Sequence, residues 1–202
     1  MNRPFFPTLG ARFAIPWRII TMSDASKLPN RQSIRLRGRD YSQDGIYFVT
    51  LCTYDRRHLF GEIVEEMMHL NASGEIVRDS WRWLEQQHGH VELGEFVVMP
   101  NHFHGNLKLH PDFRRGSAAS PPRKPLGRLI AAFKTFSTNR INKILDVPFD
   151  RVWQRNYFEH IVRNEKEFAL IEKYIHENPK RWAWDGENKL VERRSTDYSW
   201  KV

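Results

Sequence analysis

Residues 95–109 read Glu-Phe-Val-Val-Met-Pro-Asn-His-Phe-His-Gly-Asn-Leu-Lys-Leu. The segment Gly94–Pro100 is mostly apolar and predicts a buried strand that ends at a Pro-Asn turn. A strict alternation follows over His102–Leu109, which predicts another strand because successive side chains of an extended chain point to opposite faces. One face carries His102, His104, Asn106 and Lys108, and the other carries Phe103, Gly105, Leu107 and Leu109. Two histidines are therefore expected to project from the same face of one strand.

Further strands and helices are predicted on both sides of this segment. Strands are expected at Ile46–Thr53, Met67–Leu70 and Tyr157–Val162, which are rich in β-branched, aromatic or other apolar residues. Helical spacing predicts three helices: one capped by Asn71 and running to about Gln87, one over Leu129–Leu145, and one that begins at a capping box of Asn164 and Glu167 and stops at Pro179. This order predicts an α+β fold, a ferredoxin-like or RRM-like antiparallel sheet with the helices packed on one face.

The composition limits the kind of protein that the chain can be. The 202 residues suit one domain with extensions, and a hydrophobic share of 40% is enough for one core. The single cysteine, Cys52, excludes an intramolecular disulfide and a Cys-rich zinc site. No apolar run is long enough to span a membrane, and no glycine-rich nucleotide-binding motif occurs. We therefore expect a cytoplasmic protein with no membrane partner and no nucleotide cofactor.

The net charge of +8 is concentrated in two segments. Residues 1–43 carry a net +6 and residues 111–145 a net +7, whereas residues 44–110 carry a net −5. Such a concentration suits a phosphate backbone, and basic loops without a partner are the alternative. In the helix Leu129–Leu145, the residues expected to face inward are Ile130, Phe133, Ile141 and Ile144. The candidate phosphate contacts on and before this helix are Arg128, Lys134 and Arg140.

Two segments depart from this regular pattern. Four prolines interrupt Met1–Asn30, which we expect to be a disordered extension. Its first part, Met1–Thr21, is either a basic arm or an artefact of the start site, because Met22 offers another start. The segment His110–Pro125 is rich in Pro, Ser, Arg and Gly and is expected to be a loop.

Two pairs of residues could carry chemistry. Both imidazoles of His102 and His104 can reach one divalent cation, and the alternative is that they are merely solvated or hydrogen-bonded. Tyr174 and Asn178 are four residues apart beside the apolar stripe of the last helix, so they can address one site. The alternative is that Tyr174 is a core aromatic residue and Asn178 simply ends the helix. Together, the four residues favour metal-assisted phosphoryl chemistry with a tyrosine nucleophile.

The stretch Trp153-Gln-Arg-Asn-Tyr157 places two aromatic residues beside Arg155. Aromatic rings with a neighbouring cation are suited to stacking on unpaired bases, and ordinary packing at a strand edge is the alternative. Trp153, Arg155 and Tyr157 are therefore further candidate nucleic-acid contacts.

At these residues the sequence resembles the HUH-type single-tyrosine transposases, especially the REP-associated tyrosine transposases. The motifs that carry the resemblance are Arg31-Gln-Ser-Ile-Arg-Leu-Arg-Gly, Tyr47-Phe-Val-Thr-Leu-Cys-Thr, Val97-Val-Met-Pro-Asn-His-Phe-His-Gly, Trp153-Gln-Arg-Asn-Tyr-Phe-Glu-His-Ile-Val-Arg-Asn and Tyr174-Ile-His-Glu-Asn-Pro. The resemblance covers residues 31–184, and it implies a transposase domain there, between the extension at 1–30 and a C-terminal tail at 185–202.

The resemblance also implies a mechanism. His102 and His104 correspond to the metal-binding pair, with Asn178 as the third ligand of Mg²⁺ or Mn²⁺, and Tyr174 corresponds to the catalytic nucleophile. The implied reaction is attack on single-stranded DNA at a hairpin, which leaves a 5′-phosphotyrosine and a free 3′-OH. The long extension and the loop His110–Pro125 depart from the family pattern and leave hairpin preference open, as well as the choice between monomer and homodimer. A non-catalytic nucleic-acid-binding module is one alternative, and a metal hydrolase that uses water is another, although it leaves Tyr174 without a role.

Overall fold

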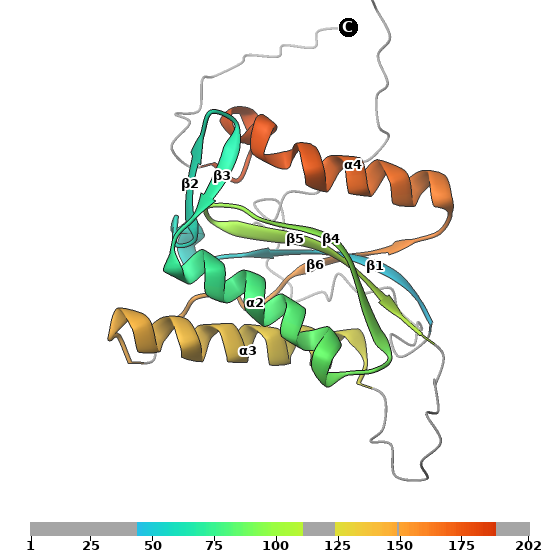
Figure 1. Ribbon diagram of the computed structural model, residues 1–202, viewed down its shortest axis with the longest axis horizontal. Helices are drawn as coiled ribbons and strands as arrows, with labels where there is room; N and C mark the ends of the chain where they lie inside the picture. Colours follow the sequence, from blue (N-terminus) through green and yellow to red (C-terminus); the bar gives the residue numbers. More distant parts are fainter. Residues whose placement is uncertain (1–43, 111–123, 149, 189–202) are drawn as a thin grey trace, which may run out of the picture. The chain divides into compact units, whose positions relative to one another are not determined.

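Figure 1 shows the computed structural model, in which the described residues are 44–110, 124–148 and 150–188. Their centre is an antiparallel sheet with the strand order β4-β5-β1-β6. The strands of this sheet are β1 (Gly45–Cys52), β4 (Val91–Val98), β5 (His102–Leu109) and β6 (Phe158–Val162). A separate hairpin consists of β2 (Gly61–Val64) and β3 (Met67–Leu70). The helices are α2 (Ala72–Gln87), α3 (Leu126–Leu145) and α4 (Glu165–Arg181), with short 3-10 turns η1 (Tyr54–Arg56) and η2 (Trp182–Trp184).

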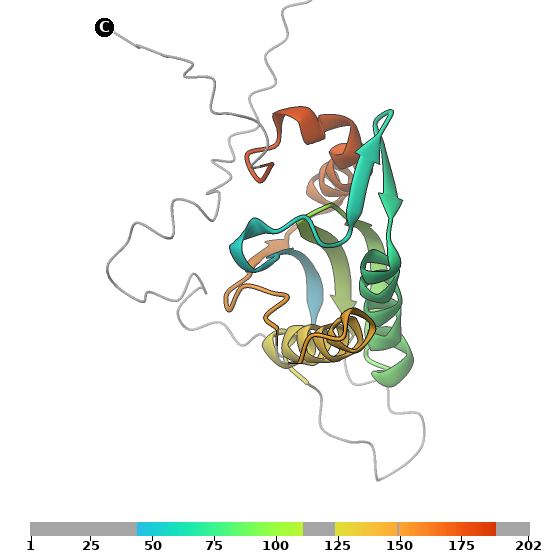
Figure 2. The same cartoon turned by 90° about the vertical axis from the view of Figure 1, so that its left-hand side faces the viewer.

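The helices cover both faces of the sheet. In Figures 1 and 2, α2 and α3 lie on one face and α4 lies on the other. The predicted α+β class and antiparallel sheet are therefore confirmed, but α4 is not on the face shared by the other helices, where it was expected. The reason is that β5 is buried on both faces, with Lys108 its only exposed residue. The face that carries the histidines therefore also needs a cover, and α4 supplies it.

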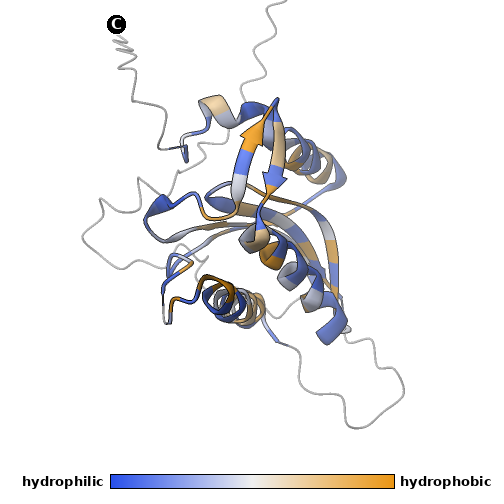
Figure 3. Cartoon of the chain, turned by 60° about the vertical axis from the view of Figure 1, so that its left-hand side comes forward, coloured by the Kyte–Doolittle hydropathy of each residue, from blue (hydrophilic) through white to orange (hydrophobic). Residues whose placement is uncertain are grey.

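Aromatic rings fill the core between the sheet and α2 and α3. The ring centroid of Trp81 lies 4.7 Å from that of Phe103 and 5.3 Å from that of Phe133, and all three side chains are fully buried. Pairs of this kind contribute about 0.5–1.5 kcal/mol beyond the burial of their apolar area. Figure 3 shows hydrophilic and hydrophobic residues interspersed along the strands and helices, as amphipathic elements require. Because Phe103 is fixed in this core, its neighbours on β5 point to the opposite face.

The strand register brings the site together. β5 lies between β4 and β1, and His102 and His104 are paired with Cys52 and Thr50 of β1. Thr50 is paired in turn with Phe158 of β6. Residues directly opposite each other in an antiparallel pair share a face of the sheet. All five side chains therefore belong to the face that α4 covers.

Several predicted boundaries agree with the structure. Asn71 is the N-cap of α2, where its side chain accepts a hydrogen bond from the Gly74 N–H, and β5 has its predicted bounds. The hairpin strand β2 was not expected, and α3 begins at Leu126 rather than Leu129. Ile144 was expected to face inward but is exposed, since it lies in the last turn of α3.

The ends of α4 differ from the prediction in two ways. Asn164 caps the helix by accepting a hydrogen bond from the Glu167 N–H, but the Glu167 carboxylate accepts from the Arg163 N–H instead of completing a capping box with Asn164. The helix also continues past Pro179 to Arg181. A proline removes only one N–H donor, a loss that is tolerable this close to the end of a helix. In the described part of the chain, no helix is both long and apolar enough to cross a membrane.

Gly105 leaves room on β5 for the ring of Phe103, which lies over it. A Cβ atom at position 105 would lie 2.8 Å from the Phe103 ring and 3.1 Å from the Trp81 ring. We expect Gly105→Ala to lower the free energy of unfolding by about 1–3 kcal/mol, the usual cost of overpacking a core. Urea unfolding followed by tryptophan fluorescence measures the loss. Gly89→Ala is the matched control because no atom lies within 4 Å of its added methyl group, and equal losses in the two variants would contradict the prediction.

Candidate active site

His102 and His104 are held by one ring nitrogen each. Nδ1 of His102 lies 2.9 Å from Oδ1 of Asn101, and Nδ1 of His104 lies 2.8 Å from the Thr50 hydroxyl. The Asn101 oxygen can only accept, so His102 donates from Nδ1 and keeps a lone pair on Nε2. The two ring centroids are 4.6 Å apart and both rings are buried. The arrangement leaves both Nε2 atoms for the site beside α4.

Burial keeps both imidazoles neutral at physiological pH. It lowers the pKa of His102 to about 4, even though the nearby Asp185 carboxylate acts in the opposite direction. Burial also lowers the pKa of His104 well below its usual value, and His102 adds to the effect. A neutral ring is the form of histidine that binds a metal ion. The histidines are therefore in the protonation state that the metal-binding prediction requires.

Tyr174 and Asn178 come to the same place from α4. The Tyr174 hydroxyl lies 3.4 Å from Nε2 of His104, and the Tyr174 ring packs edge-on against Phe48 of β1. The Asn178 side chain is buried, and its Oδ1 atom has no hydrogen-bond partner. The Asn178 side chain also acts on the pKa of both His102 and Tyr174, so the structure brings the predicted pair on the helix together with the predicted pair on the strand.

The Tyr174 phenol is difficult to ionise in the protein alone. Burial raises its pKa to about 12, the Asp185 carboxylate contributes in the same direction, and a hydrogen bond from Asn178 opposes both. A phenol with this pKa is protonated at neutral pH and is a weak nucleophile. A cation close to the phenol would oppose the shift, because it stabilises the phenolate.

The acceptor atoms that converge here fit a divalent cation. Nε2 of His102 and Oδ1 of Asn178 are buried without a hydrogen-bond partner, and Nε2 of His104 has only the long contact with Tyr174. Buried polar atoms are nearly always paired, so unpaired acceptors in one site indicate a missing partner. Within residues 44–110, 124–148 and 150–188, no three His, Cys, Asp or Glu side chains are grouped so that they could hold a metal ion. A cation held by the two histidines would therefore take its third protein ligand from an amide, and Asn178 carries a buried one.

Asp185 is a residue of this site that the sequence did not reveal. It follows η2, and its Oδ2 atom lies 3.9 Å from Nε2 of His102. The ring of Trp182, in the same segment, lies 5.9 Å from the His102 ring. No periodicity or motif marks this position, because it lies in an irregular segment after the last helix. Only the folded chain brings it to the histidines.

Lys134 and Trp153 are not placed as the DNA-contact prediction requires. The Lys134 ammonium points inward and donates to the carbonyl oxygens of Gln154, Arg155 and Asn156, at 2.8, 3.3 and 3.1 Å. Trp153 is buried in the core, and its indole N–H donates to Ser137 at 2.9 Å. Both corrections have the same cause, since the loop that leads into β6 is fastened to α3 by these side chains.

The other DNA-contact candidates differ in exposure. Arg128 and Arg155 are exposed, whereas Arg140 is half-buried with its guanidinium 5.4 Å from the Phe136 ring. Tyr157 is half-buried and lies 5.4 Å from the Lys134 ammonium. Arg155 follows Gln154, whose N–H donates to the carbonyl oxygen of Cys52, the residue paired with His102.

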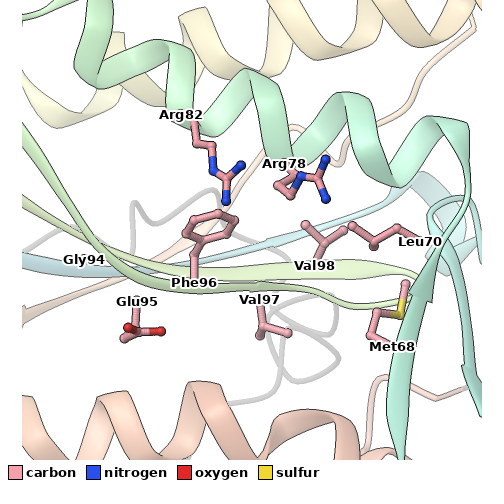
Figure 4. Close-up of a pocket in the computed structure, with 9 residues that line it drawn as sticks. All are labelled: Met68, Leu70, Arg78, Arg82, Gly94, Glu95, Phe96, Val97 and Val98. Carbon is pink, nitrogen blue, oxygen red and sulfur yellow. The ribbon is translucent and has the colours of Figure 1, made fainter.

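Figure 4 shows a hollow of about 480 Å³ along the open edge of β4. Apolar residues of β3 and β4 line it together with Arg78 and Arg82 of α2, and the Arg82 guanidinium lies 5.9 Å from the Phe96 ring. None of the four predicted site residues lines this hollow. We therefore assign it no part in the chemistry of the Tyr174 site.

Comparison with known proteins identifies a relative and a fold. No family model matches the chain. An uncharacterized protein of Haemophilus influenzae is 36% identical over 167 residues, which cover 77% of this chain and 92% of that protein. The chain belongs to the family of this protein. Among solved structures, a REP-associated tyrosine transposase bound to a REP hairpin aligns with a TM-score of 0.53 at 20% identity, over 75% of this chain and 76% of that one. This likeness shows that the chain shares the fold of that structure.

Burial of neutral histidines makes the stability depend on pH. An unfolded imidazole titrates near pH 6.5, whereas His102 in the folded chain titrates near pH 4. Between these values the unfolded chain binds more protons, so the free energy of unfolding falls as the pH is lowered through this range. We expect the titration of His102 to lower the free energy of unfolding by about 3 kcal/mol between pH 7 and pH 4. Urea unfolding between pH 7 and pH 4 measures it, and a His102→Gln variant with the same pH dependence as the natural chain would contradict the assignment.

Lys134 is expected to stabilise the fold by holding the loop before β6 against α3. Lys134→Met keeps the length of the side chain but leaves three carbonyl oxygens without their donor. We expect the free energy of unfolding to fall by about 2 kcal/mol or more, because hydrogen bonds from a charged donor are lost. Lys143→Met, on the exposed side of the same helix, is the matched control. Similar chemical denaturation curves for the two variants would show that Lys134 has no such role.

Proposed function

We propose that this protein is a metal-dependent endonuclease and strand transferase for single-stranded DNA, a transposase that uses Tyr174 as its nucleophile. The proposal rests on one observation. The Tyr174 hydroxyl lies 3.4 Å from Nε2 of His104, in a buried site where His102 Nε2 and Asn178 Oδ1 have no hydrogen-bond partner. A tyrosine that only filled the core would need none of these polar neighbours.

In the proposed reaction the Tyr174 oxygen attacks a phosphodiester. A bond forms between this oxygen and phosphorus while the bond from phosphorus to the 3′ oxygen breaks. The phenol loses its proton, and the departing 3′ oxygen takes one up. The products are a 5′-phosphotyrosine and a free 3′-OH, and attack by a 3′-OH on the phosphotyrosine rejoins the strand. Because the phosphotyrosine conserves the energy of the phosphodiester, the reaction needs no nucleotide cofactor.

Three side chains would hold Mg²⁺ or Mn²⁺ in this site, namely His102, His104 and Asn178. The cation would supply positive charge near the phosphate and the ionising phenol. The protein contributes the orientation of the ligands, since Asn101 and Thr50 fix the two rings through Nδ1. Phe48 and His104 pack against the Tyr174 ring and fix its position.

The proposed substrate is a short DNA hairpin with an unpaired strand that enters the site. The solved transposase with this fold is bound to a REP hairpin, and the proposal extends that substrate class to this chain. Arg155 would contact phosphate beside the site, while Arg128 and Arg140 would contact it from α3, on the other face of the sheet. Contacts of this kind account for most of the affinity of nucleic-acid-binding proteins. We also propose that the protein acts in the cytoplasm, with the nucleoid, as a monomer or a homodimer.

The decisive substitution is Tyr174→Phe, which keeps the ring and its packing against Phe48 and removes only the hydroxyl. We expect the variant to fold and to bind hairpin DNA with unchanged affinity, because the phosphate contacts remain. It should form no covalent adduct and make no nick, since no other group can form the phosphotyrosine. Denaturing gels of 5′- and 3′-labelled oligonucleotides with single-stranded flanks, incubated with Mn²⁺ or with EDTA, measure both products.

Tyr157→Phe is the matched control, because Tyr157 lies in the loop before β6 and not on α4. This variant should form the adduct normally. Adduct formation by Tyr174→Phe but not by Tyr157→Phe would place the nucleophile on the loop. DNA retention without cleavage by the natural chain would support a non-catalytic binding module, and cleavage without an adduct would support hydrolysis by water.

A further inference from the structure

The segment that follows α4 places a carboxylate beside the two histidines. In Figure 2 the chain turns back from the end of α4 toward the sheet. This turn carries Asp185, whose side chain is 14% exposed and whose Oδ2 atom lies 3.9 Å from Nε2 of His102. At this separation the two groups do not form a hydrogen bond. Oδ2 therefore faces the unpaired Nε2 atom across a gap.

The orientation of this carboxylate is set by its own turn. Oδ1 of Asp185 accepts a hydrogen bond of 2.8 Å from the Glu187 N–H, which leaves Oδ2 directed toward the histidine. The Asn188 amide donates to the Trp182 carbonyl oxygen at 3.1 Å and closes the same turn. The carboxylate is thus held by backbone and side-chain hydrogen bonds and does not depend on His102 for its position.

The turn is also fastened to the strand that carries the histidines. The Asn101 amide nitrogen donates to the Glu187 carbonyl oxygen at 2.6 Å, while its oxygen accepts from Nδ1 of His102. Glu187 forms an ion pair with Arg56 of η1. One asparagine therefore connects the position of the turn to the orientation of the first histidine.

The predicted ligands are all neutral, which makes a nearby carboxylate significant. Two imidazoles and an amide carry no charge when they bind a cation, whereas Mg²⁺ and Mn²⁺ prefer oxygen ligands and carboxylates in particular. Mg²⁺ also keeps several waters, which need hydrogen-bond acceptors around the ion. Oδ2 of Asp185 is a charged acceptor on the Nε2 side of the His102 ring. The Glu187 N–H donates only to Oδ1, so Oδ2 remains able to accept.

We propose that Asp185 is the carboxylate beside the cation site, where it strengthens the binding of a hard divalent cation by accepting hydrogen bonds from the waters of the ion. The inference rests on the proposed function, because it takes His102, His104 and Asn178 as the ligands. It adds a positioning residue from a segment outside the motifs that carry the resemblance.

The test measures Mn²⁺ binding to the full chain without DNA, by electron paramagnetic resonance of the free ion. Asp185→Asn removes the charge but keeps an oxygen that can accept from the Glu187 N–H, so the turn should persist. We expect its Mn²⁺ affinity to fall by about tenfold to a hundredfold, the usual effect of a residue next to a metal ligand. Asp185→Ser also keeps a turn acceptor and should show a similar loss, which guards against a folding defect in one variant.

Asp79→Asn is the matched control, since Asp79 is exposed on α2 and should leave Mn²⁺ binding unchanged. Mn²⁺ affinity equal to that of the natural chain in the folded Asp185→Asn and Asp185→Ser variants would overturn the inference. Tighter DNA binding with unchanged Mn²⁺ binding would also overturn it, because Asp185 would then act only by repelling phosphate. His102→Ala distinguishes a failure of the proposed metal site from a failure of the role of Asp185. If His102→Ala binds Mn²⁺ normally, the proposed metal site is wrong. If only His102→Ala loses Mn²⁺ affinity and the Asp185 variants do not, only the role of Asp185 is wrong.

Discussion

The orientation of two imidazoles, each tied through Nδ1, is the constraint on which the rest of the site depends. His102 is bound to the Asn101 side chain and His104 to the Thr50 hydroxyl. Rotation of either ring would break its bond and place a polar nitrogen in an apolar environment, at a cost of about 1–3 kcal/mol. Both rings also belong to a strand whose alternate residue, Phe103, is packed among core aromatics. The backbone and the side chains therefore restrict the Nε2 atoms to one direction, toward α4.

The site lowers the stability of the chain, and the aromatic core offsets the loss. Each buried acceptor without a partner, such as Nε2 of His102 or Oδ1 of Asn178, costs about 1–3 kcal/mol. Keeping two histidines neutral adds a cost below pH 6.5 because protonation favours the unfolded chain. Trp81, Phe103 and Phe133 contribute on the opposite face of the same sheet. A sheet buried on both faces can thus support a polar site on one face with an apolar core on the other.

Features that depend on local pattern could be predicted from the sequence. The alternation at His102–Leu109 predicts both the strand and the common direction of its histidines, and helical spacing predicts that Tyr174 and Asn178 share one side of α4. Asp185 could not be predicted, because its position depends on the turn that follows η2. A hydrogen bond from the Asn101 side chain to the Glu187 carbonyl oxygen holds this turn against the sheet. The side of the sheet that α4 covers could not be predicted either, since it depends on the burial of both faces of β5. Lys134 was predicted to contact phosphate. The helical pattern of α3 could not show that the loop before β6 offers this ammonium three carbonyl oxygens instead.

The charges around Tyr174 bear on how a phosphodiester would approach it in the proposed reaction. Without a cation, burial is the main cause of the raised pKa of the phenol, the charge of Asp185 adds to it, and the Arg181 guanidinium opposes it. The Asp185 carboxylate also repels a phosphodiester. A bound dication reverses the sign, because two positive charges exceed the single negative charge of Asp185. The remaining positive charge then equals in size the single negative charge of one phosphodiester. Under the proposed assignment, a cation held by His102, His104 and Asn178 would therefore favour entry of the scissile phosphate, whereas the charge of Asp185 alone would disfavour it.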